Sequence, residues 1–275
     1  MNKKLKLIEL NSLDQFRNDL LNTIEPGKVQ ELLSWFLESY GGINFKFGYS
    51  RPIFRARKCL TEHGYDNISE IYPPPSDKCK TGRMNEEGQA VFYGAFSIGT
   101  ALAEINAQEG DYVQIANFLL PENGDVGIRC FAIGEVYNVY HGNNTISSNF
   151  FNEIRGFIDR IGKGNLRDLL TYLYMDAFSA EILNSTDAYK TEYIYSRVFS
   201  RLLLGKHPSV DGLIYTSAKI KGTTNIVLRP EIVNSKMQLV SNVVMQIIKV
   251  YPYGIVDFRL VKSAKGHTLD GVIVW

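Results

Sequence analysis

The sequence TGRMNEEGQAVFYGAFSIGTALAE, residues 81–104, contains the signals of a loop, a strand and a helix in one continuous stretch. Glycine and asparagine tolerate backbone angles that other residues resist, so residues 82–88 are expected to form a loop. Residues 90–96 are apolar and aromatic, which predicts a short strand. Ser97 predicts an N-cap for a helix over residues 98–108. The chain therefore turns from loop to strand to helix here.

This stretch carries three polar side chains of interest, one on each element: Arg83, Tyr93 and Glu104. A single glutamate on a helix is most often a solvated surface residue. Glu104, however, lies four residues after Thr100, so the two side chains share one helix face beside apolar neighbours. Its position after an arginine loop and a tyrosine strand favours a binding site.

Composition excludes several function classes. The 275 residues include 30 basic and 29 acidic side chains, a formal net charge of +1, which predicts no direct binding to nucleic acid or an anionic membrane. The three cysteines are scattered, as are the four histidines, so we expect neither disulfides nor a metal site. No apolar run approaches the roughly 18 residues of a membrane helix, and no signal peptide is recognisable. We expect a cytoplasmic protein.

The N-terminus predicts a helical hairpin. Ser12 and Gln15 resemble a capping box that opens a helix to residue 22, and a second helix is expected over residues 28–39. Pro26 and Gly27 are expected to form the turn between them. The apolar face of such a hairpin is too small to fold alone, so it must pack on the rest of the chain or on a partner.

The remaining elements are read from apolar alternation and turn residues. Strands at 112–120 and 126–139 are expected to be joined by a hairpin turn at 121–125. Further helices are predicted at 149–161, 166–183 and 193–204, and further strands at 211–217, 224–228, 243–251, 254–261 and 271–275.

These elements predict an α+β fold in three parts. They are an N-terminal hairpin over residues 1–44, a central domain over 45–235 and a β-rich C-terminal extension over 236–275. A helical insertion is expected within the central domain, at about 141–187. The C-terminal part either forms a small separate lobe or extends the main sheet.

Two more arginines lie on a strand predicted over residues 52–57. Arg55 and Arg57 share one strand face, because side chains alternate along a strand. Such a pair forms either an exposed charged surface or a fork for a carboxylate or a diphosphate, to which guanidinium groups present paired donors.

Several familiar catalytic motifs are absent. The sequence has no Gly-Lys-Ser/Thr phosphate loop, no strand-coupled GxGxxG and no GxSxG, HExxH or CxxC motif. The polar residues that do cluster are arginine, tyrosine, glutamate and serine. This set suits the binding of a polarised, anionic substrate better than the formation of an acyl-enzyme.

The order of these motifs resembles the RES domain, a family named for its arginine, glutamate and serine. The matching segments are Phe54-Arg55-Ala56-Arg57, Gly82-Arg83-Met84-Asn85-x-x-Gly88, Val91-Phe92-Tyr93-x-Ala95, Thr100-Ala101-Leu102-Ala103-Glu104, Gly212-Leu213-Ile214-Tyr215-Thr216-Ser217 and Asn225-Ile226-Val227-Leu228. The likeness covers roughly residues 50–230, and the part from Arg83 to Glu104 is the most specific. Met84 stands where the family commonly has tryptophan.

The resemblance implies an ADP-ribosyltransferase-like fold, with a mixed sheet core and flanking helices. It implies that the domain over residues 45–235 binds NAD as a substrate and cleaves its nicotinamide–ribose bond, as a glycohydrolase or phosphorylase. Many members of the family act as toxins, so we expect a toxin or defence effector and an antitoxin protein as partner. We also expect a homo-oligomer, without a prosthetic group.

Carried over by position, the resemblance implies site residues. Those with catalytic roles are Glu104, Arg55, Tyr93 and Ser217, and those that bind NAD are Arg83, Arg57 and Asn85. The glutamate would stabilise the ribose as it becomes positively charged, and the tyrosine would stack on nicotinamide or ribose. Arg55 and Arg83 would hold the diphosphate. Ser217 would bond the nicotinamide amide or brace Arg55.

Two residue assignments and the type of activity stay open. Arg57 is an alternative to Arg55, and Ser196 is an alternative to Ser217. The same pocket would also serve an ADP-ribosyltransferase that modifies a protein or nucleic acid, or an inactive module that binds NAD. An interaction role dominated by the N-terminal hairpin is a further alternative.

Overall fold

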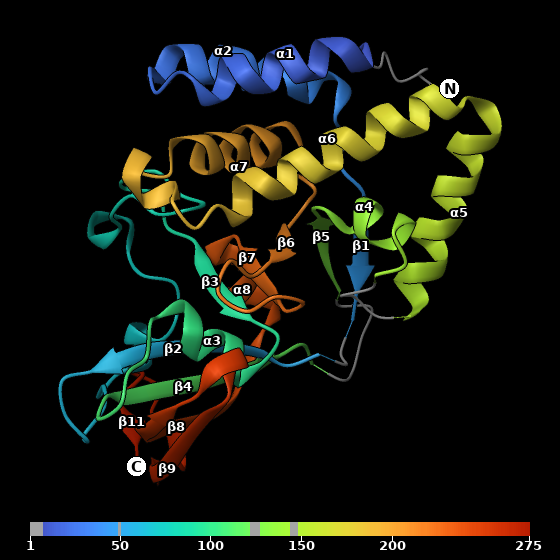
Figure 1. The fold of residues 1–275 in the computed structure, drawn as a ribbon. Helices are drawn as coiled ribbons and strands as arrows, with labels where there is room; N and C mark the ends of the chain where they lie inside the picture. The colour runs from blue at the N-terminus through green and yellow to red at the C-terminus, as the bar shows by residue number, and fades with distance from the viewer. Residues whose placement is uncertain (1–7, 49–50, 122–126, 144–147) are drawn as a thin grey trace. The chain divides into compact units, whose positions relative to one another are not determined.

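A computed structural model describes residues 8–48, 51–121, 127–143 and 148–275 and has the α+β class predicted from the sequence (Figure 1). The helices are α1 (Leu10–Leu21), α2 (Pro26–Ser39), α3 (Ile98–Glu104), α4 (Glu135–Tyr140), α5 (Ser148–Gly164), α6 (Leu166–Asn184), α7 (Ile194–Lys206) and α8 (Pro230–Lys236). The strands are β1 (Asn44–Phe47), β2 (Ile53–Cys59), β3 (Phe92–Ala95), β4 (Tyr112–Leu119), β5 (Ile128–Ala132), β6 (Gly212–Thr216), β7 (Thr224–Leu228), β8 (Gln238–Val250), β9 (Val256–Ser263), β10 (Gly266–His267) and β11 (Ile273–Val274). Within the described ranges, no helix is both long and apolar enough to cross a membrane.

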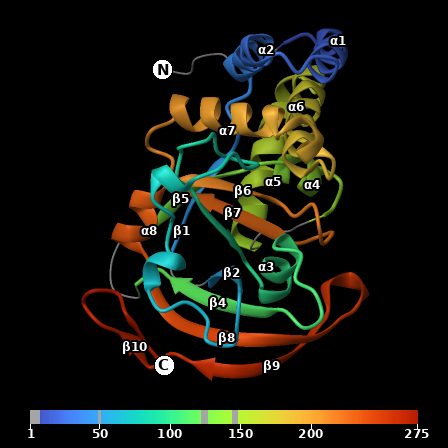
Figure 2. The same cartoon turned by 90° about the vertical axis from the view of Figure 1, so that its left-hand side faces the viewer.

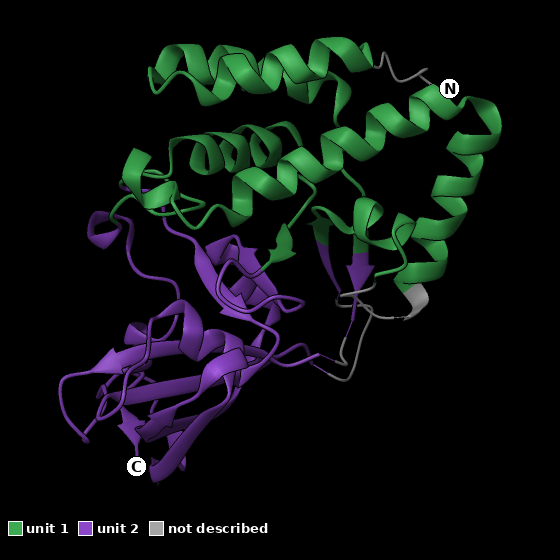
Figure 3. Ribbon diagram, viewed as in Figure 1, with its two compact units in different colours: residues 1–45, 80–87, 130–216 green, residues 46–79, 88–129, 217–275 purple. Residues whose placement is uncertain are grey.

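The chain divides into two compact units, each assembled from segments that are far apart in the sequence (Figure 3). Unit 1 comprises residues 1–45, 80–87 and 130–216, and unit 2 comprises residues 46–79, 88–129 and 217–275. The three-part division at residues 44 and 235 stays a prediction.

Unit 1 is mainly helical, and the predicted N-terminal hairpin is part of it. Helices α1 and α2 pack on α6 and α7 through aromatic side chains. Phe16 stacks on Phe36 with ring centroids 5.1 Å apart, and both rings meet Phe178 of α6 edge-on. Helix α2 begins at Pro26 rather than after it, because proline suits the first turn of a helix and the Glu25 carboxylate caps the turn. The hairpin therefore buries its apolar face within its own chain.

The predicted strand over residues 126–139 is wrong in its second half, which forms helix α4. Gly134 has φ = 85°, which ends β5, and its N–H donates to Asp176 at 3.1 Å. The N–H of Tyr137 donates to the other oxygen of Asp176 at 3.0 Å. A buried carboxylate from α6 thus caps α4, a long-range contact that no local pattern contains.

The predicted hairpin between the two strands is wrong as well. Strand β5 pairs in parallel with β6, whereas β4 pairs with β2 and β8. Most of the predicted turn at 121–125 lies outside the described residues.

Unit 2 contains an antiparallel sheet in the order β7-β3-β2-β4-β8-β9 (Figure 2). Phe54 and Ala56 of β2 face helix α3 and share an apolar core with Ala95 and Leu102. The C-terminal strands β8 and β9 extend this sheet. Strands β10 and β11 form a separate two-stranded ribbon.

Candidate functional site

Helix α3 positions Glu104. Ser97 caps the helix, since its Oγ accepts the N–H of Thr100 at 3.2 Å and bonds the Thr100 hydroxyl at 2.7 Å. The helix ends at Glu104 rather than at residue 108, because Asn106 adopts a left-handed conformation with φ = 49°. Glu104 therefore stands in the last turn of α3.

The Glu104 carboxylate is oriented by two donors on the same oxygen. Its Oε1 accepts from Ser217 Oγ at 2.6 Å and from Asn225 Nδ2 at 2.6 Å. Oε2 makes no hydrogen bond within the described part of the chain. Hydrogen bonds to an ionised oxygen are short and directional, so these two fix the carboxylate plane and leave one oxygen open.

Ser217 is itself held in place. Its Oγ accepts the N–H groups of Lys219 at 3.0 Å and Ile220 at 3.2 Å, and its own N–H donates to the Thr223 carbonyl at 2.8 Å. With two donors directed at Oγ, the hydroxyl hydrogen remains for Glu104. The structure thus brings together Glu104 and Ser217, two of the residues predicted from the sequence.

Asn225 is the second partner of Glu104, and the sequence pointed to it only as the first residue of a segment that resembles the family. It lies on β7 opposite Ala95 of β3 and is 2% exposed. Its Oδ1 is buried and has no hydrogen-bond partner among the described residues. The signal was a polar residue within an otherwise apolar strand after the serine, in Thr224-Asn225-Ile226-Val227-Leu228.

Tyr93 lies on the same sheet face as Glu104. Side chains at alternate strand positions share a face, so Tyr93 points to the same side of β3 as Ala95, the partner of Asn225. The side chain is half-buried. Glu104, Ser217, Asn225 and Tyr93 therefore form one group on the α3 side of the sheet, called the Glu104 cluster below.

Arg55 lies on the opposite face of the sheet. Its guanidinium is 5.2 Å from the Phe92 ring centroid, and Nη1 donates to the Tyr93 carbonyl at 3.2 Å. Its Nε is buried without a hydrogen-bond partner among the described residues. Burial, with the nearby charge of Arg57, lowers the pKa of Arg55 to about 10.

Arg57 shares the face of Arg55, as predicted, and is paired within unit 2. Its Nη1 lies 3.0 Å from Glu70 Oε2 and also donates to the Glu70 carbonyl. The guanidinium lies 4.8 Å from the Tyr65 ring centroid. Neither arginine thus shares a sheet face with the Glu104 cluster.

Arg83 belongs to unit 1, where it caps the end of helix α6. Its Nη1 donates to the carbonyls of Leu183 and Ser185, both at 2.9 Å, and its guanidinium lies 5.4 Å from the Tyr193 ring centroid. Within the described ranges, Nε and Nη2 make no hydrogen bond. Arg83 therefore has both a structural role and unused donors.

Asn85 shapes the loop that carries Arg83. Its side-chain nitrogen donates to the carbonyls of Lys80 at 2.8 Å and Glu86 at 3.0 Å, and its carbonyl accepts the N–H of Gly82 at 3.0 Å. The side chain is 4% exposed. These bonds close the turn on which Arg83 sits.

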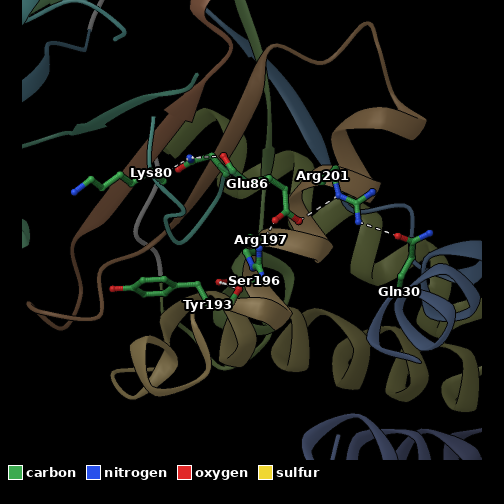
Figure 4. Close-up of polar contacts among 8 residues, drawn as sticks. Gln30, Lys80, Glu86, Tyr193, Ser196, Arg197 and Arg201 are labelled. Atoms are coloured by element: carbon green, nitrogen blue, oxygen red, sulfur yellow. Dashed lines mark hydrogen bonds and ion pairs between the residues drawn. The ribbon is translucent and has the colours of Figure 1, made fainter. Parts of the chain in front are cut away.

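Ser196, the alternative serine, also lies in unit 1. Figure 4 shows it beside Tyr193 and Arg197. It is buried in α7, and its Oγ donates to the Tyr193 carbonyl at 3.2 Å. Beside it, Glu86 is paired with both Arg197 and Arg201. Of the two serines, Ser217 is the one bonded to Glu104.

Residues 52–243 match the family model of the RES domain. The chain belongs to the RES family. This confirms the resemblance inferred from the sequence, and strands β9 to β11 lie beyond the matched residues.

Two other comparisons indicate no further family for this RES protein. No curated protein matches its sequence. A similar solved structure is the crystal structure of the M. tuberculosis MbcT–MbcA toxin–antitoxin complex, with 10% sequence identity and a TM-score of 0.41 over 82% of this chain and 94% of that chain.

Proposed function

We propose that this RES-family protein degrades NAD by cleaving the bond between nicotinamide and ribose. The observation that carries the proposal is the oriented carboxylate of Glu104. Two donors hold Oε1, and Oε2 is left open within the described residues. A fixed carboxylate of this kind suits a sugar that becomes positively charged.

In the proposed reaction, the bond between ribose C1′ and the nicotinamide nitrogen breaks. Its electron pair stays with the nitrogen, so nicotinamide leaves as a neutral molecule and the ribose becomes an oxocarbenium-like cation. Glu104 stabilises this cation electrostatically and accepts hydrogen bonds from the ribose hydroxyls. Water then adds to C1′ and releases a proton, which gives ADP-ribose. Phosphate in place of water would give the phosphorylated sugar.

The other residues of the Glu104 cluster orient the acid and the substrate. Ser217 and Asn225 hold the carboxylate, since both donate to Oε1 at 2.6 Å. The other polar atom of the Asn225 side chain, Oδ1, is buried and is assigned no contact with the substrate. We assign Tyr93 to stacking on nicotinamide or ribose, which excludes water from one side of the reacting bond.

The arginines take different roles in this proposal. The diphosphate contact that the resemblance implies for Arg83 stays a prediction, and the donors left for it are Nε and Nη2, which have no hydrogen-bond partner in the described ranges. Asn85 keeps the Arg83 loop in shape. We assign Arg55 to positioning, since its Nη1 holds the carbonyl of Tyr93, and Arg57 to the ion pair with Glu70.

Incubation of purified protein with NAD labelled in its adenosine part tests the proposal. We expect nicotinamide release together with free labelled ADP-ribose or its phosphate. Label on a protein or nucleic acid would instead indicate ADP-ribosyl transfer. Binding of NAD without nicotinamide release would contradict the proposed cleavage.

Expression in cells gives an independent test. An NAD-degrading toxin is expected to lower cellular NAD and arrest growth, and the Glu104→Gln variant is expected to do neither. A partner protein that restores growth when co-expressed would be the predicted antitoxin. Unchanged NAD under strong expression of the wild-type chain would contradict a toxin role.

A further inference from the structure

Strand β9 forms the outer edge of the unit 2 sheet (Figure 2). Among the described residues, no strand pairs with its outer side. Proteins usually protect such an edge, because unpaired N–H and C=O groups readily accept another strand. β9 instead exposes two large apolar side chains, Phe258 at 40% and Leu260 at 55%.

The two faces of β9 differ in character. Phe258 lies opposite Ile247 and Leu260 opposite Met245, so both continue the apolar face that α3 covers further along the sheet. Val256 lies on the same face and packs on that core. The other face carries one acid and one base, Asp257 and Arg259, at alternate positions.

Every second residue of β9 directs its backbone N–H and C=O groups away from β8. The N–H of Tyr251 donates to the Ile255 carbonyl at 2.8 Å, so the backbone carbonyl of Ile255 points toward β8. Alternation then turns the backbone groups of Val256, Phe258 and Leu260 outward. The pairing of β8 with β9 has an extra residue at 248 of β8, opposite Asp257 and Phe258, and another at 261 of β9, so β9 itself has no extra residue between 256 and 260.

We propose that β9 pairs with β9 of a second copy of this chain, antiparallel, with Phe258 on the two-fold axis. In this register Asp257 lies opposite Arg259 of the second copy, and the same pair recurs on the other side of the axis. Val256 lies opposite Leu260 of the second copy, so one face of the new ladder is apolar. An interface between identical surfaces has to be self-complementary in this way.

Charge selects this register over its neighbours. If the axis moved by one residue to Asp257, the two aspartates would face each other across the strands. If it moved to Arg259, the two arginines would do so. Like charges directly opposite destabilise a strand pair, and opposite charges stabilise it. The axis at Phe258 pairs both charged positions favourably.

A charge exchange tests the proposal on the full-length chain by sedimentation equilibrium over a range of concentrations. We expect the wild type to sediment with twice the mass of one chain. Asp257→Arg and Arg259→Asp each bring like charges opposite, so each single variant is expected to sediment as a monomer. The double variant restores opposite charges and is expected to dimerise.

Mixing the two single variants gives a sharper result. One carries two arginines and the other two aspartates at these positions, so the mixture is expected to form a heterodimer although each alone is monomeric. Circular dichroism of every variant checks that the fold is retained. A monomeric wild type, single variants that dimerise as well as the wild type, or a mixture that stays monomeric would each overturn the proposal.

Cysteine cross-linking tests the register. Position 258 faces itself across the axis, at a Cα separation of about 5.5 Å, which a disulfide can span. Under mild oxidation, Phe258→Cys is therefore expected to form a covalent dimer, whereas Leu260→Cys, which faces position 256, is not. The wild type controls for the three native cysteines. Equal cross-linking of both variants, or of neither, would overturn the register.

Discussion

At the scale of single residues, the candidate site depends on how one carboxylate is held. Ser217 and Asn225 both donate to Oε1 of Glu104, and two backbone N–H groups hold the Ser217 hydroxyl in turn. In the proposed reaction, this arrangement keeps the acid aligned while charge develops on the ribose. Alignment of a charged group before reaction is a large part of enzymatic rate enhancement.

Ser217→Ala removes one of the two donors to Glu104. We expect the rate constant for nicotinamide release to fall about tenfold, because a hydrogen bond to a charged group is worth about 1.5 kcal/mol. The matched control is Ser196→Ala, whose hydroxyl donates to the backbone carbonyl of Tyr193, the residue before α7. A larger loss in Ser196→Ala than in Ser217→Ala would reverse the assignment of the serine.

Asp176 predicts a pH dependence of stability in unit 1. It is fully buried and accepts a hydrogen bond from Tyr40 at 2.7 Å, and burial raises its pKa from 3.8 to about 6. A carboxyl with a raised pKa stabilises the folded state below its unfolded pKa, and this contribution is lost as the pH rises through the folded value. Between pH 4 and pH 6.5 the loss is on the order of 2 kcal/mol.

Urea unfolding of the wild type and Asp176→Asn at several pH values measures this effect. We expect the free energy of unfolding of the wild type to fall, relative to the variant, as the pH rises from 4 to 6.5. Asparagine keeps an acceptor for Tyr40 but does not ionise, so it lacks this slope. The same pH dependence in both proteins would contradict a raised pKa for Asp176.

Much of the site composition, but not its geometry, could be predicted from the sequence. Glu104 and Ser217 lie 113 residues apart and are hydrogen-bonded. Both were found from the order of the motifs, because a motif assigns a residue type to a position in the sequence. It does not say which sheet face each one occupies, so it grouped Arg55 with Glu104. Asn225 was quoted within a matching segment but given no role, because its bond to Glu104 joins residues 121 positions apart.

At the scale of elements, helix α3 connects stability to the site, because its last residue is Glu104. Ser97→Ala removes the cap of this helix. We expect the free energy of unfolding to fall by about 1 kcal/mol, measured by urea denaturation. Ser235→Ala is the matched control, as its hydroxyl bonds a carbonyl on the exposed side of α8. Equal losses of unfolding free energy in both variants would show that the Ser97 cap stabilises the protein no more than the exposed Ser235 hydroxyl does.

Elements with a strong local signal were predicted best. The strand over 90–96 and the N-cap at Ser97 are found as β3 and α3. Helix α4 was missed because the carboxylate that caps it comes from a distant part of the chain. The pairing of β5 with β6 was missed for the same reason, since parallel strands are joined by long crossovers.

At the scale of the whole molecule, each of the two units consists of three segments, and the segments of the two units alternate along the sequence. The N-terminal hairpin and residues 130–216 pack into one unit, and the C-terminal strands join residues 46–79 and 88–129 in the other. The expected elements were grouped into three parts in sequence order, and that division stays a prediction. The contacts within each of the two units join segments that are far apart in the sequence.

The N-terminal hairpin is expected to be essential for the folding of unit 1. Phe36 is fully buried and lies with its ring centroid 5.9 Å from that of Phe178. We expect Phe36→Ala to lower the free energy of unfolding by about 3–5 kcal/mol. Trp35→Ala, one position along and 42% exposed, is the control and is expected to cost less. A small effect in Phe36→Ala would mean that the hairpin is a dispensable appendage.

The most direct measurement for the proposed function is nicotinamide release from NAD by the purified wild-type chain and by Glu104→Gln, side by side. Glutamine keeps the size of the side chain and an oxygen for Ser217 and Asn225 but removes the charge. We predict release by the wild type and a loss of about a hundredfold or more in the variant. Equal rates in the two proteins would contradict the role of Glu104, and no release by the wild type would contradict NAD cleavage itself.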